Sequence, residues 1–110
     1  MKPTRKSCPS FYVLIHVAGD FDVAKQACRE FCFQEGLCVT VTETAYIYTG
    51  GEEAGVTVRL MNYPRFPKKG KTIWEIAERL GEALRQRLCQ HSFCLESPKE
   101  TQWVTYREDR

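Results

Sequence analysis

The chain has 110 residues, 16 of them basic and 14 acidic, and 43% of its residues are apolar. This length and composition predict one globular domain with a modest hydrophobic core. The small net charge of +2 argues against a dedicated polyanion binder, and no apolar run approaches the roughly 18 residues that span a bilayer, so neither nucleic acid nor a membrane is an expected partner.

The first ten residues are basic and contain proline, so we expect a flexible arm over residues 1–10 and a single domain over residues 11–110. Residues 11–18 have a β-rich composition and predict a first strand. Basic residues before this run faintly resemble a signal peptide, but the run is short and contains His16. Without a secretion signal, the six cysteines are expected as reduced thiols and the protein is expected in the cytoplasm.

A helix is predicted over residues 21–35, where apolar side chains recur at three- and four-residue spacing. Asp20 or Asp22 can cap its start by accepting a backbone N–H, and Gly36 is placed to end it. The stripe that should face the core comprises Ala24, Ala27, Cys28, Phe31 and Cys32.

Two further strands are predicted over residues 37–48 and 56–63, joined by a glycine-rich hairpin loop at residues 50–55. In the first of these strands, the alternation of apolar and polar residues is interrupted near Glu43, which favours a bulge or bend there. A basic, proline-bounded loop at residues 64–71 follows the second strand.

The second helix is expected to begin at a capping box in which Thr72 accepts a backbone N–H and Glu75 reaches back. Short strands at residues 93–96 and 102–106 should close the fold, separated by a turn that contains Pro98. The helix's predicted apolar stripe comprises Ile73, Ile76, Ala77, Leu80, Leu84 and Leu88.

This order of elements predicts an α+β, ferredoxin-like βαββαβ sandwich. Its sheet should be antiparallel and four-stranded, with both helices on one face and a possible extra C-terminal strand. Because this fold hosts many unrelated activities, the architecture alone does not identify a function.

One end of the predicted sheet gathers an acidic set of residues that could bind a cation or a small ligand. The paired glycines in it would let the backbone approach a ligand, although solvated surface acids are the simpler interpretation. The candidate ligand-binding residues are Asp20, Gly50, Gly51, Glu52, Glu53 and His91.

Two other clusters carry weaker signals. Cys89, His91 and Cys94 could supply three zinc ligands, but the spacing lacks a CxxC pair and no fourth ligand is evident, so no metal or cofactor is expected. A basic loop with aromatic neighbours could contact phosphates and bases, or it could be a rigid loop with solvated charges. Its candidate residues are Arg65, Lys68, Lys69 and Lys71.

The sheet face away from the helices is the main predicted interaction surface. If alternate residues of the first strand face the core, the others form a patch with residues of the third strand that is too apolar for water. A second copy of the chain, a protein partner or the C-terminal segment could cover this face. The candidate interface residues are Tyr12, Leu14, His16, Arg59, Met61 and Tyr63.

About half of the chain resembles the divalent-cation-tolerance (CutA-type) proteins, which are relatives in shape of the PII signalling proteins. The resemblance is carried by residues 23–25 at the start of the first helix, residues 35–39 after it, and residues 46–48 at the end of a long strand. It implies a ferredoxin-like trimer assembled through sheet edges.

From these patterns we expect a non-catalytic binding or regulatory module that self-associates or docks on a protein partner, a class that includes small inhibitors of the kind encoded by phages and mobile elements. A small-ligand or metal-binding protein that uses the acidic end of the sheet is the second hypothesis. An enzyme with cysteine or histidine chemistry is the third, and no catalytic residue is assigned because neither histidine lies in a nucleophile motif.

Overall fold

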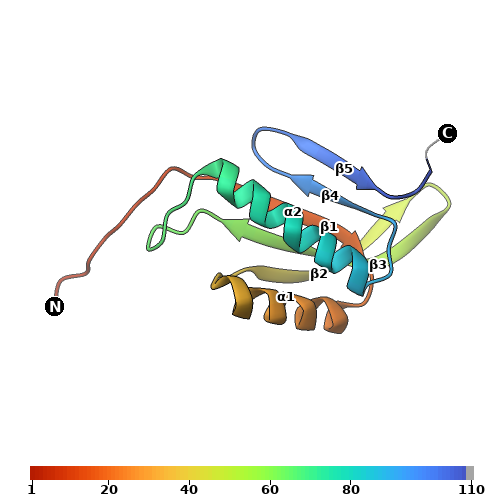
Figure 1. Ribbon diagram of the computed structural model, residues 1–110, viewed down its shortest axis with the longest axis horizontal. Helices are drawn as coiled ribbons and strands as arrows, with labels where there is room; N and C mark the ends of the chain where they lie inside the picture. The colour runs from red at the N-terminus through yellow and green to blue at the C-terminus, as the bar shows by residue number, and fades with distance from the viewer. Residues whose placement is uncertain (109–110) are drawn as a thin grey trace.

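Within residues 1–108, five strands form one antiparallel sheet and two helices lie on the same face of it (Figure 1). The computed structural model describes residues 1–108, and the last two residues of the predicted domain lie outside this range. The strand order β2-β3-β1-β4-β5 confirms the α+β, ferredoxin-like prediction, and β5 is the extra C-terminal strand. The elements are β1 (Tyr12–Ala18), α1 (Phe21–Glu35), β2 (Thr40–Tyr48), β3 (Gly51–Met61), α2 (Gly70–Arg87), β4 (Ser92–Glu96) and β5 (Thr101–Thr105).

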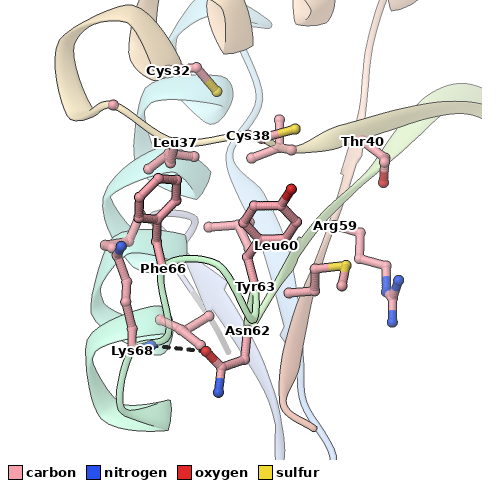
Figure 2. Close-up of a pocket in the computed structure, with 15 residues that line it drawn as sticks. Cys32, Leu37, Cys38, Thr40, Arg59, Leu60, Asn62, Tyr63, Phe66 and Lys68 are labelled. Atoms are coloured by element: carbon pink, nitrogen blue, oxygen red, sulfur yellow. Dashed lines mark hydrogen bonds between the residues drawn. The ribbon is translucent and has the colours of Figure 1, made fainter. Parts of the chain in front are cut away.

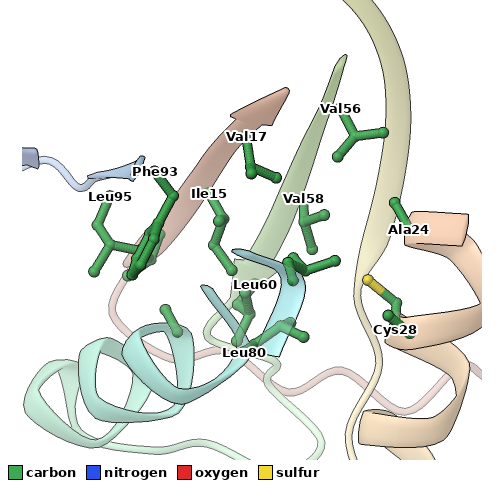
Figure 3. Close-up of a cluster of buried hydrophobic side chains, with 14 of the residues drawn as sticks. Ile15, Val17, Ala24, Cys28, Val56, Val58, Leu60, Leu80, Phe93 and Leu95 are labelled. Atoms are coloured by element: carbon green, nitrogen blue, oxygen red, sulfur yellow. The ribbon is translucent and has the colours of Figure 1, made fainter. Parts of the chain in front are cut away.

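The core lies between the two helices and strands β1, β3 and β4 (Figure 3). Alternate residues of β1 point into it, and Val13, Ile15 and Val17 are buried as predicted. All six residues of the predicted apolar stripe around α2 are buried as well. The alternation in the strand and the helical spacing therefore identified the two sides of this core correctly.

Both ends of α1 match the prediction. The carboxylate of Asp20 accepts a hydrogen bond from the backbone N–H of Val23 at 3.0 Å, and the N–H of Gly36 donates to the carbonyl of Cys32 at 2.8 Å. Cys28 is buried against the core, and this burial, helped by the nearby Cys32 thiol, raises the pKa of Cys28 to about 12. Cys28 is therefore an inert core residue, as expected.

The β2–β3 hairpin is longer and more regular than predicted. Its ladder runs without interruption from the Thr40–Arg59 pair to the Tyr48–Gly51 pair, so the predicted loop at residues 50–55 is mostly strand. Gly50, with a φ of 89°, supplies the left-handed conformation of a tight turn. The predicted bulge near Glu43 is absent, because the slip in polarity there reflects a solvent-exposed edge strand and not a break in pairing.

The predicted capping box of α2 is wrong. The helix begins at Gly70 with Lys69 as its N-cap, and no side chain caps it, so Thr72 lies inside the first turn. The preceding loop sets this earlier start, because the carboxamide of Asn62 accepts a hydrogen bond from the backbone N–H of Lys68 at 2.9 Å. Tertiary contacts of the loop therefore override the local capping signal.

The end of the predicted N-terminal arm contacts the folded domain. Asn62 also donates from its side chain to the carbonyl of Pro9 at 2.9 Å, which ties the end of the predicted arm to the domain. Within residues 1–108, neither helix has the length and apolar character needed to cross a membrane.

Candidate functional site

An acidic hollow lies at the end of the sheet where β1 stops and the hairpin projects. Its volume is about 470 Å³, and it is wide open to solvent. Two carboxylates and one carboxamide supply its polar side chains, and among residues 1–108 no basic side chain lines it. The lining residues are Ala18, Gly19, Asp20, Glu53, Ala54 and Gln90.

The backbone at the end of β1 shapes one wall of this hollow. Gly19 has a φ of 137°, and its N–H donates to the carbonyl of Ala54 at 2.9 Å. A Cβ at Gly19 would lie 2.7 Å from the side chain of Leu88, so both the conformation and the space require glycine. This turn places Asp20, the N-cap of α1, beside the start of β3.

Two tyrosines of β2 flank Glu53 on the neighbouring strand. Tyr46 is the direct cross-strand partner of Glu53, and the hydroxyl of Tyr48 donates to Oε1 of Glu53 at 3.2 Å. Desolvation and the adjacent carboxylate raise the pKa of Tyr48, so it remains a neutral donor. A carboxylate between two aromatic rings can accept hydrogen bonds from a ligand's hydroxyls or face a cation, while the rings contact its flat surfaces.

Contacts with β3 and β1 fix the position of the Tyr46 side chain. Its hydroxyl donates to the carbonyl of Val56 at 2.6 Å, and its ring meets His16 edge-on with centroids 6.4 Å apart. Burial raises the pKa of Tyr46. His16 is in turn bonded through Nε2 to Glu96 at 2.8 Å, which extends a polar network across the open sheet face.

The structure brings together only part of the predicted ligand site. Asp20 and Glu53 share the hollow, whereas Glu52 lies one position away on the strand, where side chains point to the opposite face. His91 follows the lining residue Gln90 but does not itself line the hollow. Gly50 and Gly51 form the hairpin turn and the first position of β3.

The second predicted cluster, a possible zinc site, is not formed. Within the described residues 1–108, no group of three or more histidine, cysteine or acidic side chains is arranged to hold a metal ion, so Cys89, His91 and Cys94 do not form the zinc site considered above. Sequence analysis missed Tyr46, Tyr48 and Gln90. The two tyrosines stand at alternate positions of a strand, but the predicted loop at residues 50–55 left Glu53 without a cross-strand partner, so their pairing with it was not visible.

Five of the six candidate interface residues, all except Tyr63, share the open face along β1 and β3. Tyr12 pairs with Met61 and Leu14 with Arg59, and the Arg59 guanidinium stacks over the Tyr12 ring at 4.9 Å. Tyr63 departs from this face because it lies beyond β3, in a short bridge with Phe66. The role of this face as an interface stays a prediction.

The basic loop does not form one continuous cluster. The Arg65 guanidinium lies over the ring of Phe66, 5.3 Å from its centroid. Lys68 lines a separate apolar pocket, Lys69 caps α2, and Lys71 lies in the first turn of that helix. The four residues therefore serve different local roles, and the absence of nucleic-acid binding stays a prediction.

Comparison with known proteins places the fold. No family model and no curated protein matches the sequence. Among solved structures, a phage SAM lyase in the apo state matches with a TM-score of 0.73 and 17% identity over 91% of this chain and 92% of that chain. A phage SAM lyase in complex with S-methyl-5'-thioadenosine matches with a TM-score of 0.69 and 16% identity over 98% of this chain and 100% of that chain.

These matches correct two expectations. The resemblance to CutA-type and PII proteins is wrong, because the solved structures that superpose on nearly the whole chain are SAM lyases. The expectation of a non-catalytic interaction module or inhibitor is overturned by the same finding, since the two solved structures that match are those of an enzyme, a SAM lyase. The second hypothesis, a small-ligand site at the acidic end of the sheet, agrees better with it. At these identities the likeness establishes the fold.

Proposed function

We propose that this protein binds S-adenosylmethionine (SAM) in the acidic hollow and cleaves it, releasing S-methyl-5'-thioadenosine. The observation that carries this proposal is the near full-length structural match to SAM lyases, one of them holding that thioadenosine. The match runs over 91–98% of this chain and 92–100% of the matched chains.

Charge identifies the hollow as the better of the two cavities for this substrate. SAM carries a sulfonium and an ammonium against one carboxylate, so it is a net cation at neutral pH. The hollow offers Asp20 and Glu53 without a basic side chain, whereas the apolar pocket at the other end of the sheet is lined by Arg59 and Lys68 without an acidic one. A cation is attracted to the first and repelled by the second.

The reaction can be written without an added reagent. The bond between sulfur and the γ-carbon breaks, and its electron pair returns to sulfur, which neutralises the sulfonium. The substrate's own carboxylate oxygen forms the new bond to that carbon and closes a five-membered lactone. The protein's task is then to hold the four-carbon chain in this folded geometry, which is catalysis by orientation.

A second route would use Glu53 as a base. Removal of a β-proton by this carboxylate, with loss of the same sulfur leaving group, would give an unsaturated amino acid in place of the lactone. Both routes release S-methyl-5'-thioadenosine, so the four-carbon product distinguishes them.

The primary test incubates the purified protein with SAM and measures both products by liquid chromatography with mass detection. We expect S-methyl-5'-thioadenosine above the rate of spontaneous decay. Glu53→Gln should lower the rate at least tenfold, whereas Glu52→Gln, a matched change on the same strand but outside the hollow, should leave it unchanged. An equal loss of rate in both variants would show that the hollow takes no specific part in the reaction. Absence of product with the native chain would refute the proposed activity.

Equilibrium binding separates recognition from turnover. The sulfonium of SAM is charged, while the sulfide of S-methyl-5'-thioadenosine is neutral. If Glu53 faces the sulfonium, Glu53→Gln should weaken SAM binding more than thioadenosine binding. Isothermal titration calorimetry with both ligands measures the two changes in affinity. Equal losses of affinity for SAM and for the thioadenosine would indicate that Glu53 contacts the adenosyl group, which the two ligands share.

A further inference from the structure

A second cavity lies at the opposite end of the sheet from the acidic hollow. Its volume is about 430 Å³, within the range of sites for drug-sized ligands. It is formed where the chain leaves α1, where β2 begins, and where β3 runs into the bridge between Tyr63 and Phe66 (Figure 2). Its lining shares no residue with the hollow.

The walls of this pocket are held by specific hydrogen bonds. On one side, the N–H groups of Gly36 and Leu37 both donate to the carbonyl of Cys32, at 2.8 and 3.4 Å, which closes the end of α1. On the other side, the buried Asn62 bonds the backbone of Lys68 and of Pro9 through its carboxamide. The cavity is therefore preformed and does not depend on a ligand for its shape.

Its interior is apolar and aromatic. Figure 2 shows Leu37, Leu60, Tyr63 and Phe66 gathered around the space. The rings of Tyr63 and Phe66 are tilted by 42° to each other, with their centroids 6.3 Å apart. Two rings at this angle can contact a flat apolar body from two sides. The thiol-bearing Cys38 lines the same space and is exposed to solvent.

One positive charge, that of the exposed Lys68, lies at the edge of this space. The side chain of Lys68 runs along Phe66 toward Leu37, whereas the guanidinium of Arg59 points away from the pocket (Figure 2). That guanidinium lies over the ring of Tyr12, 4.9 Å from its centroid. In the part of the chain that the structure describes, no acidic side chain lines the cavity. An anionic group beside Lys68 would be attracted to the ammonium while its apolar body is removed from water.

We infer that this pocket binds a small amphipathic anion: a compact aromatic or aliphatic body with one carboxylate or sulfonate placed at Lys68. The inference does not depend on the proposed lyase activity, because it uses a different cavity of opposite charge. It implies that the protein takes a second ligand, chemically unlike the cationic substrate proposed for the hollow.

Two fluorescent probes of similar size test the charge requirement. The first, 8-anilinonaphthalene-1-sulfonate, has an aromatic body and one sulfonate; the second, N-phenyl-1-naphthylamine, has the same body without the charge. We expect the native chain to bind the anionic probe at one site and more tightly. Lys68→Gln should weaken the anionic probe about tenfold, as for loss of one charge-assisted contact, and leave the neutral probe unchanged. Lys69→Gln, the adjacent lysine outside the pocket, is the matched control and should change neither.

Thiol footprinting locates the bound probe. Cys38 lines the pocket, while Cys89 is also exposed but lies outside it. Saturating anionic probe should slow alkylation of Cys38 severalfold and leave Cys89 unaffected, as measured by peptide mass spectrometry. Filling the pocket by Leu37→Trp should abolish this protection, with far-UV circular dichroism confirming that the variant is folded.

The outcomes separate this inference from the proposed function. Binding of several probe molecules, unprotected Cys38, or equal effects of Lys68→Gln and Lys69→Gln would overturn the anion site. Displacement of the probe by SAM would overturn the assignment of two separate sites. A protein that forms no thioadenosine but passes the probe and footprint tests would refute the lyase proposal and leave the anion site in place.

Discussion

Replacing Gly55 by alanine tests how tightly Tyr46 is seated beside the acidic hollow. A Cβ at Gly55 would lie 2.3 Å from Cε2 of Tyr46 and 2.7 Å from the carbonyl oxygen of Val17. Both separations are roughly 1 Å short of ordinary van der Waals contact, and the second partner is the backbone of the neighbouring strand, which cannot rotate away. Overpacking of this kind costs about 1 to 3 kcal/mol. We expect the cost of Gly55→Ala to lie near the upper limit of this range, although alanine otherwise stabilises a strand more than glycine does.

Urea unfolding followed by far-UV circular dichroism measures this effect. A loss of about 3 kcal/mol lowers the midpoint by about 1.5 M when the m value is about 2 kcal/mol per M. Gly51→Ala on the same strand is the control, because its Cβ would meet only the exposed Tyr48 side chain, at 3.0 Å, and that ring can swing outward. It should change stability by less than about 0.5 kcal/mol. An unchanged midpoint for Gly55→Ala, or equal losses for both variants, would refute this packing argument.

Three further predictions concern a helix cap, acid stability and assembly. Asp20→Ala should cost about 1 kcal/mol in urea unfolding because it removes the cap of α1, whereas Asp22→Ala should cost much less; similar losses would contradict the cap. Hydrogen bonds from Arg85 lower the pKa of Glu82 in the folded state, so this pair stabilises the fold above the ordinary carboxyl pKa and loses its effect as the pH falls through the lowered folded value. Glu82→Gln should therefore flatten the decline of the urea midpoint on acidification, and an unaltered pH profile would show that the pair contributes nothing. If the open face joins copies of the chain, Leu14→Asp should shift the native mass to that of the monomer and preserve helical content; a native chain that is already monomeric at high concentration would end that prediction.

Most of the fold could be predicted because the spacing of apolar residues along a strand or helix indicates which side chains are buried. The alternation around Ile15 and the helical spacing through Leu80 each place a stripe of side chains in the core, and both residues are fully buried. The end of α1 was equally clear, because Asp20 and Gly36 act through contacts within a few residues. Local chemistry with a local partner is visible in a sequence.

The errors arose where the deciding contact is distant in sequence. Thr72 and Glu75 have the pattern of a capping box, but Asn62 fixes the loop and the helix begins earlier. The polar, glycine-rich residues of the hairpin predict a loop, whereas pairing between the two strands decides the hairpin's length. With the register uncertain, the position of Glu53 beside Tyr46 could not be derived, and the candidate site was only half recognised.

The length of β3 determines how the two cavities can influence each other. Glu53 lies in the hollow near the start of this strand and Met61 lines the apolar pocket at its end. Eight residues of extended chain separate them by roughly 26 Å, at about 3.3 Å per residue. That distance is about three Debye lengths at physiological ionic strength, so the charge of a ligand in one cavity is screened from the other. The two sites should therefore be occupied independently as far as electrostatics is concerned, and any measured coupling between a cationic ligand at Glu53 and an anionic probe at Lys68 must be carried by the packing of the strand itself.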